Sequence, residues 1–81
     1  MAMYNINDIE IGGKALVKGL LTHGTMRRRM LDIGLVSGAE VECVGESPMG
    51  DPRAYLICGA VIAIRRSDGD KVIITDKNRT D

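Results

Sequence analysis

Residues 27–66, RRRMLDIGLVSGAEVECVGESPMGDPRAYLICGAVIAIRR, decide the fold of this chain. The stretch begins with a basic segment that ends at Gly34, and apolar runs separated by glycines and prolines follow it. Short apolar runs bounded by turn residues are typical of β-strands. Several such strands in one small chain favour a closed barrel over an open sheet, because closure removes exposed strand edges.

The basic segment predicts a helix of about two turns over residues 26–33. Met26, Met30 and Ile33 fall at positions i, i+4 and i+7, which is the spacing of one core-facing helix stripe. Thr25 is the expected N-cap. The helix is the one insertion in an otherwise β-rich chain.

The sequence also predicts where this helix ends. Gly34 stands where a left-handed residue closes many helices, because glycine adopts a positive φ without steric cost. Leu35 follows it as the apolar residue that packs back onto Met30. We therefore expect the helix to stop at Gly34.

The remaining chain predicts five strands, at residues 14–21, 39–44, 54–58, 60–64 and 71–75. Residues 6–11 form an apolar N-terminal clip, and Gly59 marks a tight bend. Residues 45–53 are expected to be a loop, because two prolines, a glycine and an aspartate oppose strand pairing. Residues 65–70 are polar and suit a single helical turn. The expected fold is mainly β, a small barrel of about five strands with a short inserted helical segment.

Length and composition fix the class of protein. The 81 residues suit one domain spanning residues 1–81, with residues 76–81 as a frayed tail. Apolar residues make up 44% of the chain, without Trp or Phe, so the core is expected to be aliphatic. Eleven basic and 11 acidic residues balance, which argues against nucleic-acid binding and permits weak homodimerisation. No secretion signal or membrane-spanning run is present, which predicts a cytoplasmic protein without direct membrane insertion.

The order of these pieces resembles the FeoA family of small proteins associated with bacterial ferrous iron uptake. The resemblance lies in the arginine-rich segment running into MLDIGL, then Ser37-Gly38 with VECV, PMGDP and AIRR. Ser37 departs from the proline common in the family. The resemblance implies an SH3-like barrel and a partner, the membrane ferrous iron importer with a cytoplasmic GTPase domain. The function it implies is that of a cytoplasmic accessory or regulatory protein that binds this importer. Similar domains in iron-dependent repressors leave a metal-linked regulatory module as the alternative.

Arg27, Arg28 and Arg29 are the first candidate site, as a docking surface for an acidic partner. The alternative is a solvated helix face, the usual fate of a charge run. Cations near a helix start oppose the helix dipole at a cost of about 0.3–1 kcal/mol each when exposed. That cost indicates that something offsets it.

The second candidate site is the loop residues Met49, Gly50, Asp51 and Pro52, because loops on a rigid scaffold often carry binding residues. Met49 favours this interpretation, because methionine adapts well at interfaces. The alternative is that the loop is only a connector stiffened by two prolines.

Metal binding, cofactors and catalysis find little support in the sequence. His23, Cys43 and Cys58 lie far apart without a paired-ligand motif, and the two cysteines are expected to be reduced, buried thiols. His23 beside a glycine suits an exposed loop. No nucleophile–base pair or phosphate-binding glycine loop stands at motif spacing, so we expect no enzyme and neither a bound metal nor a cofactor.

Overall fold

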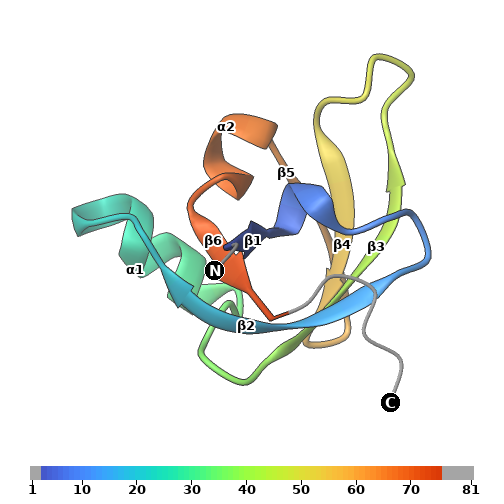
Figure 1. Ribbon diagram of the computed structural model, residues 1–81. Helices are drawn as coiled ribbons and strands as arrows, with labels where there is room; N and C mark the ends of the chain where they lie inside the picture. Colours follow the sequence, from blue (N-terminus) through green and yellow to red (C-terminus); the bar gives the residue numbers. More distant parts are fainter. Residues whose placement is uncertain (1–2, 76–81) are drawn as a thin grey trace.

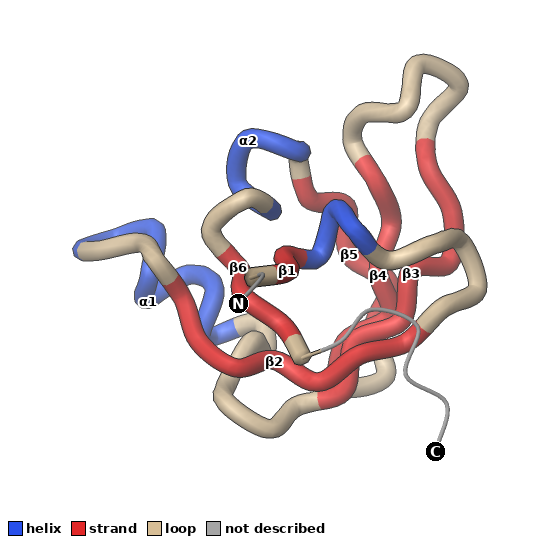
Figure 2. Tube along the Cα trace, in the orientation of Figure 1, coloured by secondary structure: helices blue, strands red, loops and turns tan. Residues whose placement is uncertain are grey.

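The alternation of apolar residues along the chain produces a strongly curved antiparallel sheet (Figures 1 and 2). The computed structural model describes residues 3–75. Its elements, in chain order, are β1 (Tyr4–Asn5), η1 (Ile6–Asp8), β2 (Lys14–Leu20), α1 (Gly24–Asp32), β3 (Glu40–Glu46), β4 (Arg53–Ile57), β5 (Ala60–Ile64), α2 (Arg66–Gly69) and β6 (Val72–Ile74). Residues 76–81, expected to be a frayed tail, lie outside this range.

The observed architecture confirms a mainly β barrel with a short inserted helix. In the described range, six strands rather than five form the sheet, in the order β1-β6-β2-β3-β4-β5. The additional strand, β1, comes from the N-terminal segment, where Tyr4 pairs with Ile74 of β6. The helix α1 is inserted between β2 and β3, and the predicted single turn over residues 65–70 is α2.

Each central strand turns one row of side chains into an aliphatic core. Alternate residues of β2 and β3 are buried, and alternate residues of their neighbouring strands β6 and β4 are buried as well. Leu35 and Met30 add the helix side of the core. The buried hydrophobic residues are Ile6, Ile9, Ala15, Val17, Met30, Leu35, Val41, Cys43, Tyr55, Ile57, Ile64, Val72 and Ile74.

The predicted loop over residues 45–53 is shorter in the structure. A register shift between Cys43 and Gly45 leaves Val44 without a partner, and the ladder then resumes as Gly45 opposite Ala54 and Glu46 opposite Arg53. Such a β-bulge lets one strand carry an extra residue and continue pairing. The connecting loop is therefore residues 47–52.

The β4–β5 connection is a two-residue turn, which confirms the tight bend expected at Gly59. Cys58 and Gly59 have φ of 50° and 83°, and the strands resume with Ile57 opposite Ala60. Two successive left-handed residues define the hairpin turn whose twist matches that of its strands. Cys58 is exposed there and only Cys43 is buried, so the expectation of two buried thiols is wrong for Cys58; both thiols are free.

Strand pairing alone does not close the barrel, contrary to expectation. Strands β1 and β5 stand at opposite ends of the strand order, and within residues 3–75 no ladder joins them. Side chains of β4 bridge the gap to the η1 segment instead. Figure 1 shows η1 lying across the barrel beside β4.

The bridge is the guanidinium of Arg53, which is only 4% exposed. Its Nη1 donates to the carbonyl oxygens of Ile6 (3.3 Å) and Asn7 (2.8 Å), and its Nη2 donates to that of Ile9 (2.6 Å). Its Nε donates to Glu46 Oε1 at 3.2 Å. The planar fork of arginine suits several acceptors at fixed angles. One side chain thus fixes the N-terminal segment to β4.

Tyr55 completes this bridge from the same strand. Its hydroxyl donates to the Ile6 carbonyl at 3.0 Å and accepts from Arg53 Nη1 at 3.3 Å. Burial raises the pKa of the Tyr55 hydroxyl to about 12, an effect that the nearby Arg53 charge partly opposes. The neutral phenol is therefore the form that the fold stabilises.

We expect Arg53→Met to lower the free energy of unfolding by about 3 kcal/mol or more, because it orphans buried carbonyls and removes a buried charge partner. Urea denaturation followed by circular dichroism measures the loss. Arg53→Lys keeps the charge but lacks the forked guanidinium, so its free energy of unfolding should lie between those of the wild type and Arg53→Met. This variant keeps the test decisive if Arg53→Met does not fold. Arg65→Ala, at an exposed position, is the control and should change stability by about 0.5 kcal/mol or less. A methionine variant as stable as this control would contradict the bridging role.

The raised pKa of Tyr55 predicts a stability loss in alkali. The unfolded chain ionises its tyrosines near the ordinary value of 10.0, whereas folded Tyr55 stays neutral until about pH 12. The unfolded state therefore releases protons first, and stability should fall as pH rises from about 10 to 12. Tyr55→Phe should flatten this part of a pH series of urea midpoints. An unchanged slope in the variant would show that another group causes the loss.

Candidate functional site

The helix α1 carries the first candidate residues, and its C-terminal end is formed as expected. Gly34 has φ of 108°, its N–H donates to the Leu31 carbonyl at 3.0 Å, and the Leu35 N–H donates to the Met30 carbonyl at 3.0 Å. These two bonds define a Schellman motif. Leu35 and Met30 are both buried, so the end of the helix is fixed to the core.

The start of α1 differs from the prediction. The helix begins at Gly24, with His23 as an extended N-cap that makes no side-chain cap hydrogen bond, so the assignment of Thr25 as N-cap is wrong. Gly24 has φ of 62°, a left-handed value that glycine adopts without steric cost, so it forms the turn that leads from the extended His23 into the helix. The prediction chose Thr25 because threonine is a better capping residue than histidine.

This earlier start changes the electrostatics of the three arginines. Arg27 now closes the first turn, and Arg29 belongs to the last turn, where a cation is favourable to the helix dipole. The dipole cost expected for three cations thus does not apply to Arg29. All three arginines are exposed. Within residues 3–75, none of them makes an ion pair or a side-chain hydrogen bond.

The three arginines point to two different surfaces. Arg27 and Arg28 border an open hollow of about 350 Å³ on the outer side of α1, together with Gly24, Leu31 and Asp32. Arg29 borders a second hollow of about 170 Å³, on the side of the helix that faces β5 and α2. The charge run is thus one segment in sequence and two sites in space.

The second hollow is a groove between α1 and β5. Apolar side chains from both elements form its walls, while one cation and one anion stand among them. The lining residues are Met26, Arg29, Met30, Ile33, Ile62, Ala63, Ile64 and Asp68. We refer to this set as the α1–β5 groove. The predicted apolar stripe of Met26, Met30 and Ile33 therefore serves both the core and this groove.

The loop of residues 47–52 is held by its own hydrogen bonds. Ser47 Oγ donates to the Asp51 carbonyl (2.7 Å) and accepts from the Asp51 N–H (3.1 Å). Two backbone bonds, from Gly50 N–H to Ser47 O and from Ser47 N–H to Pro52 O, close the loop further. Its geometry is set before any partner arrives.

Arg66 attaches this loop to α2. Its Nε donates to the Gly50 carbonyl at 2.8 Å, and its N–H donates to Asp51 Oδ1 at 3.0 Å. Gly50 and Asp51 thus have a structural role, whereas Met49 at the tip is 90% exposed. Of the predicted loop residues, Met49 and Pro52 are the exposed ones whose side chains make no hydrogen bond within residues 3–75.

The two predicted sites do not form one cluster. Figure 1 places α1 and the loop between β3 and β4 at opposite sides of the molecule. The elements between them are β5 and α2, since Asp68 borders the α1–β5 groove and Arg66 binds the loop. A partner that meets both sites would therefore extend across β5 and α2.

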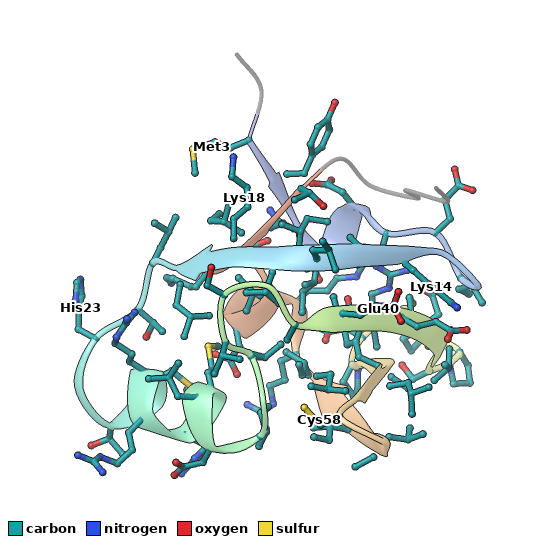
Figure 3. All side chains as sticks on the ribbon, turned by 90° about the horizontal axis from the view of Figure 1, so that it is seen from below. Met3, Lys14, Lys18, His23, Glu40 and Cys58 are labelled. Atoms are coloured by element: carbon teal, nitrogen blue, oxygen red, sulfur yellow. The ribbon has the colours of Figure 1, made fainter. Side chains whose placement is uncertain are left out.

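The remaining candidate residues do not come together. His23 projects from the start of α1 and Cys58 from the β4–β5 turn, on separate parts of the molecule (Figure 3). His23 is exposed, as expected. Among residues 3–75 no three His, Cys, Asp or Glu side chains are grouped as a metal site. In the same range, no helix is both long and apolar enough to span a membrane.

Sequence reasoning missed Arg53, which was placed in the loop. The sequence does contain a pattern that predicts the strand position of Arg53: Arg53, Tyr55 and Ile57 stand two residues apart, which puts them on one strand face. The exposure of β5 was also missed, because its sequence AVIAI reads as a buried strand, yet only Ile64 is buried.

Comparison with solved structures defines the class of protein. The FeoA-like protein of Clostridium acetobutylicum superposes with a TM-score of 0.82 at 31% identity, covering 93% of this chain and 87% of that one. Stenotrophomonas maltophilia FeoA, described as a prokaryotic SH3 domain protein and solved with zinc, superposes at 0.80 with 20% identity, over 94% and 99% of the two chains. The chain is a small SH3-like barrel.

The family follows from the sequence profile. The FeoA domain model matches residues 4–76, so the chain belongs to the FeoA domain family. Among characterised proteins it is 28% identical over 67 residues to the Fe(2+) transport protein A/Fe(2+) transporter FeoB fusion protein of Porphyromonas gingivalis. That match covers 83% of this chain and 8% of the much longer fusion protein.

The end of α1 allows one direct test of the local geometry. A Cβ on Gly34 would stand 2.5 Å from Cys58 Sγ and 3.2 Å from Ile57 Cγ2, whereas a Cβ on Gly38 would meet nothing within 4 Å. Both glycines have positive φ, so backbone strain is common to the two sites. Gly34→Ala should therefore lower the urea-derived stability by about 1 kcal/mol more than Gly38→Ala. Equal losses of stability in the two variants would indicate that the chain around residue 34 shifts enough for the added Cβ to avoid Ile57 and Cys58.

Proposed function

We propose that this protein is an accessory factor of bacterial ferrous iron uptake that binds the cytoplasmic part of a membrane iron importer with a GTPase domain. The observation that carries the proposal is the fusion relative, in which a region similar to this chain is joined to a ferrous iron transporter. Domains fused in one protein often act on each other, and a separate chain of the same family would achieve the same by binding. The factor acts on the cytoplasmic side and catalyses no reaction itself.

The surface described above supports binding as the mode of action. Three guanidinium groups on α1 have no partner within residues 3–75, and unpaired arginines suit acidic partner surfaces, because each offers several donors. The loop around Met49 is held in place by Ser47 and Arg66, so little conformational entropy is lost when it is covered. A preformed loop with an exposed methionine and an arginine-bearing helix make a two-part contact surface.

Binding of this kind regulates an importer when it favours one of its states. A protein that binds one conformation tenfold more tightly than another shifts their ratio tenfold, which corresponds to about 1.4 kcal/mol. We propose that docking acts through such a difference between nucleotide states of the importer. No chemical step by this chain is needed.

The test replaces Arg27, Arg28 and Arg29 together with Glu and measures binding to the purified cytoplasmic region of the cognate importer. We expect the affinity to fall by about a hundredfold or more, because attraction becomes repulsion at three positions. The exposed positions of the arginines predict an unchanged fold, which circular dichroism checks.

The matched control reverses three other exposed cations, Lys14, Lys18 and Lys71, which lie on β2 and before β6. It changes the net charge by the same amount and should bind nearly as the wild type. Equal losses in both triple variants would mean that only overall charge matters, and this would reject α1 as the docking site. Met49→Ser should weaken binding with no change in net charge.

A further inference from the structure

The outer edge of β5 is one of the two end edges of the sheet. The strand ends the sheet order, and its five residues, Ala60 to Ile64, are all apolar. Natural edge strands are usually protected by a lysine, a proline, a bulge, or a covering helix or loop. β5 has no lysine, proline or bulge: its register with β4 runs without a shift from Ala60 to Ile64. The helix α1 forms the other wall of the α1–β5 groove and leaves Val61 and Ala63 exposed. Val61 is 64% exposed.

The hydrogen-bonding groups on this edge can be assigned from the turn. Because Ile57 and Ala60 flank a two-residue turn, they form the first bonded pair, and bonding to β4 then recurs at every second residue. The N–H and C=O groups of Val61 and Ala63 therefore point away from β4. Neither residue makes a backbone hydrogen bond to another element in the described part of the chain.

The α1–β5 groove runs beside this edge. Ile62 and Ile64 lie on the inward face of β5, and both border the groove. Their pairing partners on β4 are Tyr55 and Arg53, respectively. A strand added to β5 would lie over the groove, and every second side chain would point into it. Its volume of about 170 Å³ is close to that of cavities of roughly 150 Å³ that accept a benzene ring.

We propose that the outer edge of β5 and the α1–β5 groove bind an extended segment of the importer's cytoplasmic region as an additional strand. This mode combines main-chain hydrogen bonds with a pocket for one apolar side chain. The inference rests on the proposed function, for which it names the contact. The segment is apolar and carries an acidic residue that meets Arg29 at the α1 side of the groove.

Charge complementarity distinguishes this occupant from a second copy of the chain. Arg29 borders the groove without an ion pair in residues 3–75, while Asp68 stands on the α2 side. A second β5 would bring Arg65 and Arg66 directly after its apolar residues rather than an acid. A partner segment with an acid toward α1 fits this groove better than β5 itself.

Amide hydrogen exchange tests the edge directly. The Val61 and Ala63 amides should exchange rapidly in the free protein and slow by about tenfold or more when the cytoplasmic region of the cognate importer is bound. Ala63→Pro removes an N–H that β4 does not use, so the fold should persist while affinity falls by about tenfold. Ala63→Ser, which retains this N–H, is the matched control and should lose clearly less affinity than Ala63→Pro.

The two arginine surfaces supply a second, independent comparison. Arg29→Glu should weaken binding more than Arg28→Glu, because only Arg29 borders the α1–β5 groove. Binding with Val61 and Ala63 unprotected, together with wild-type affinity of Ala63→Pro, would overturn the edge assignment and leave the proposed function standing. Absence of any binding would overturn both. Protection that rises with the concentration of this protein alone would assign the edge to a second copy and contradict the proposal.

Discussion

The buried guanidinium of Arg53 is the interaction on which the barrel depends. Within residues 3–75 no ladder joins β1 to β5, the two ends of the strand order, so hydrogen bonding between strands does not close the sheet. Arg53 and Tyr55 close it by binding the carbonyl groups of the η1 segment, which covers the core through Ile6 and Ile9. Burying a charge is costly unless its donors are satisfied, and here carbonyl oxygens and the Glu46 carboxylate accept from all three guanidinium nitrogens.

The same network extends from the core to the candidate site. Glu46 Oε1 accepts from Arg53 at 3.2 Å and lies 3.6 Å from Arg66 Nη2, so one carboxylate joins the buried arginine to the exposed one. Arg66 in turn holds the loop that carries Met49. The loop that carries Met49 is therefore linked through Arg66 and Glu46 to the residue that closes the barrel. The rest of the core is mostly aliphatic, as the absence of Trp and Phe predicts, and Tyr55 is its one aromatic side chain among the fully buried residues of the described range.

The sequence predicted those features that local chemistry determines. The helix end at Gly34, the tight turn at Gly59 and the helical turn after Arg65 each follow from one or two residues, and all are present. The features it missed depend on distant partners. Arg53 looked like part of a proline loop because its backbone carbonyl acceptors lie more than 40 positions earlier in the chain. Likewise, AVIAI reads as a buried strand, and only the strand order reveals it as an edge. For the candidate site, the exposed arginines were predictable, but their division between two surfaces was not.

The proposed function of this small barrel depends on contact with an iron importer. An NMR titration of the isotopically labelled protein with the importer's cytoplasmic region, with GDP and then with a GTP analogue, examines this contact residue by residue. We expect chemical-shift changes that gather on α1, β5 and the loop around Met49, with different affinities for the two nucleotide states. Shifts confined to the β2–β3 side of the barrel, or no shifts with either nucleotide, would contradict it.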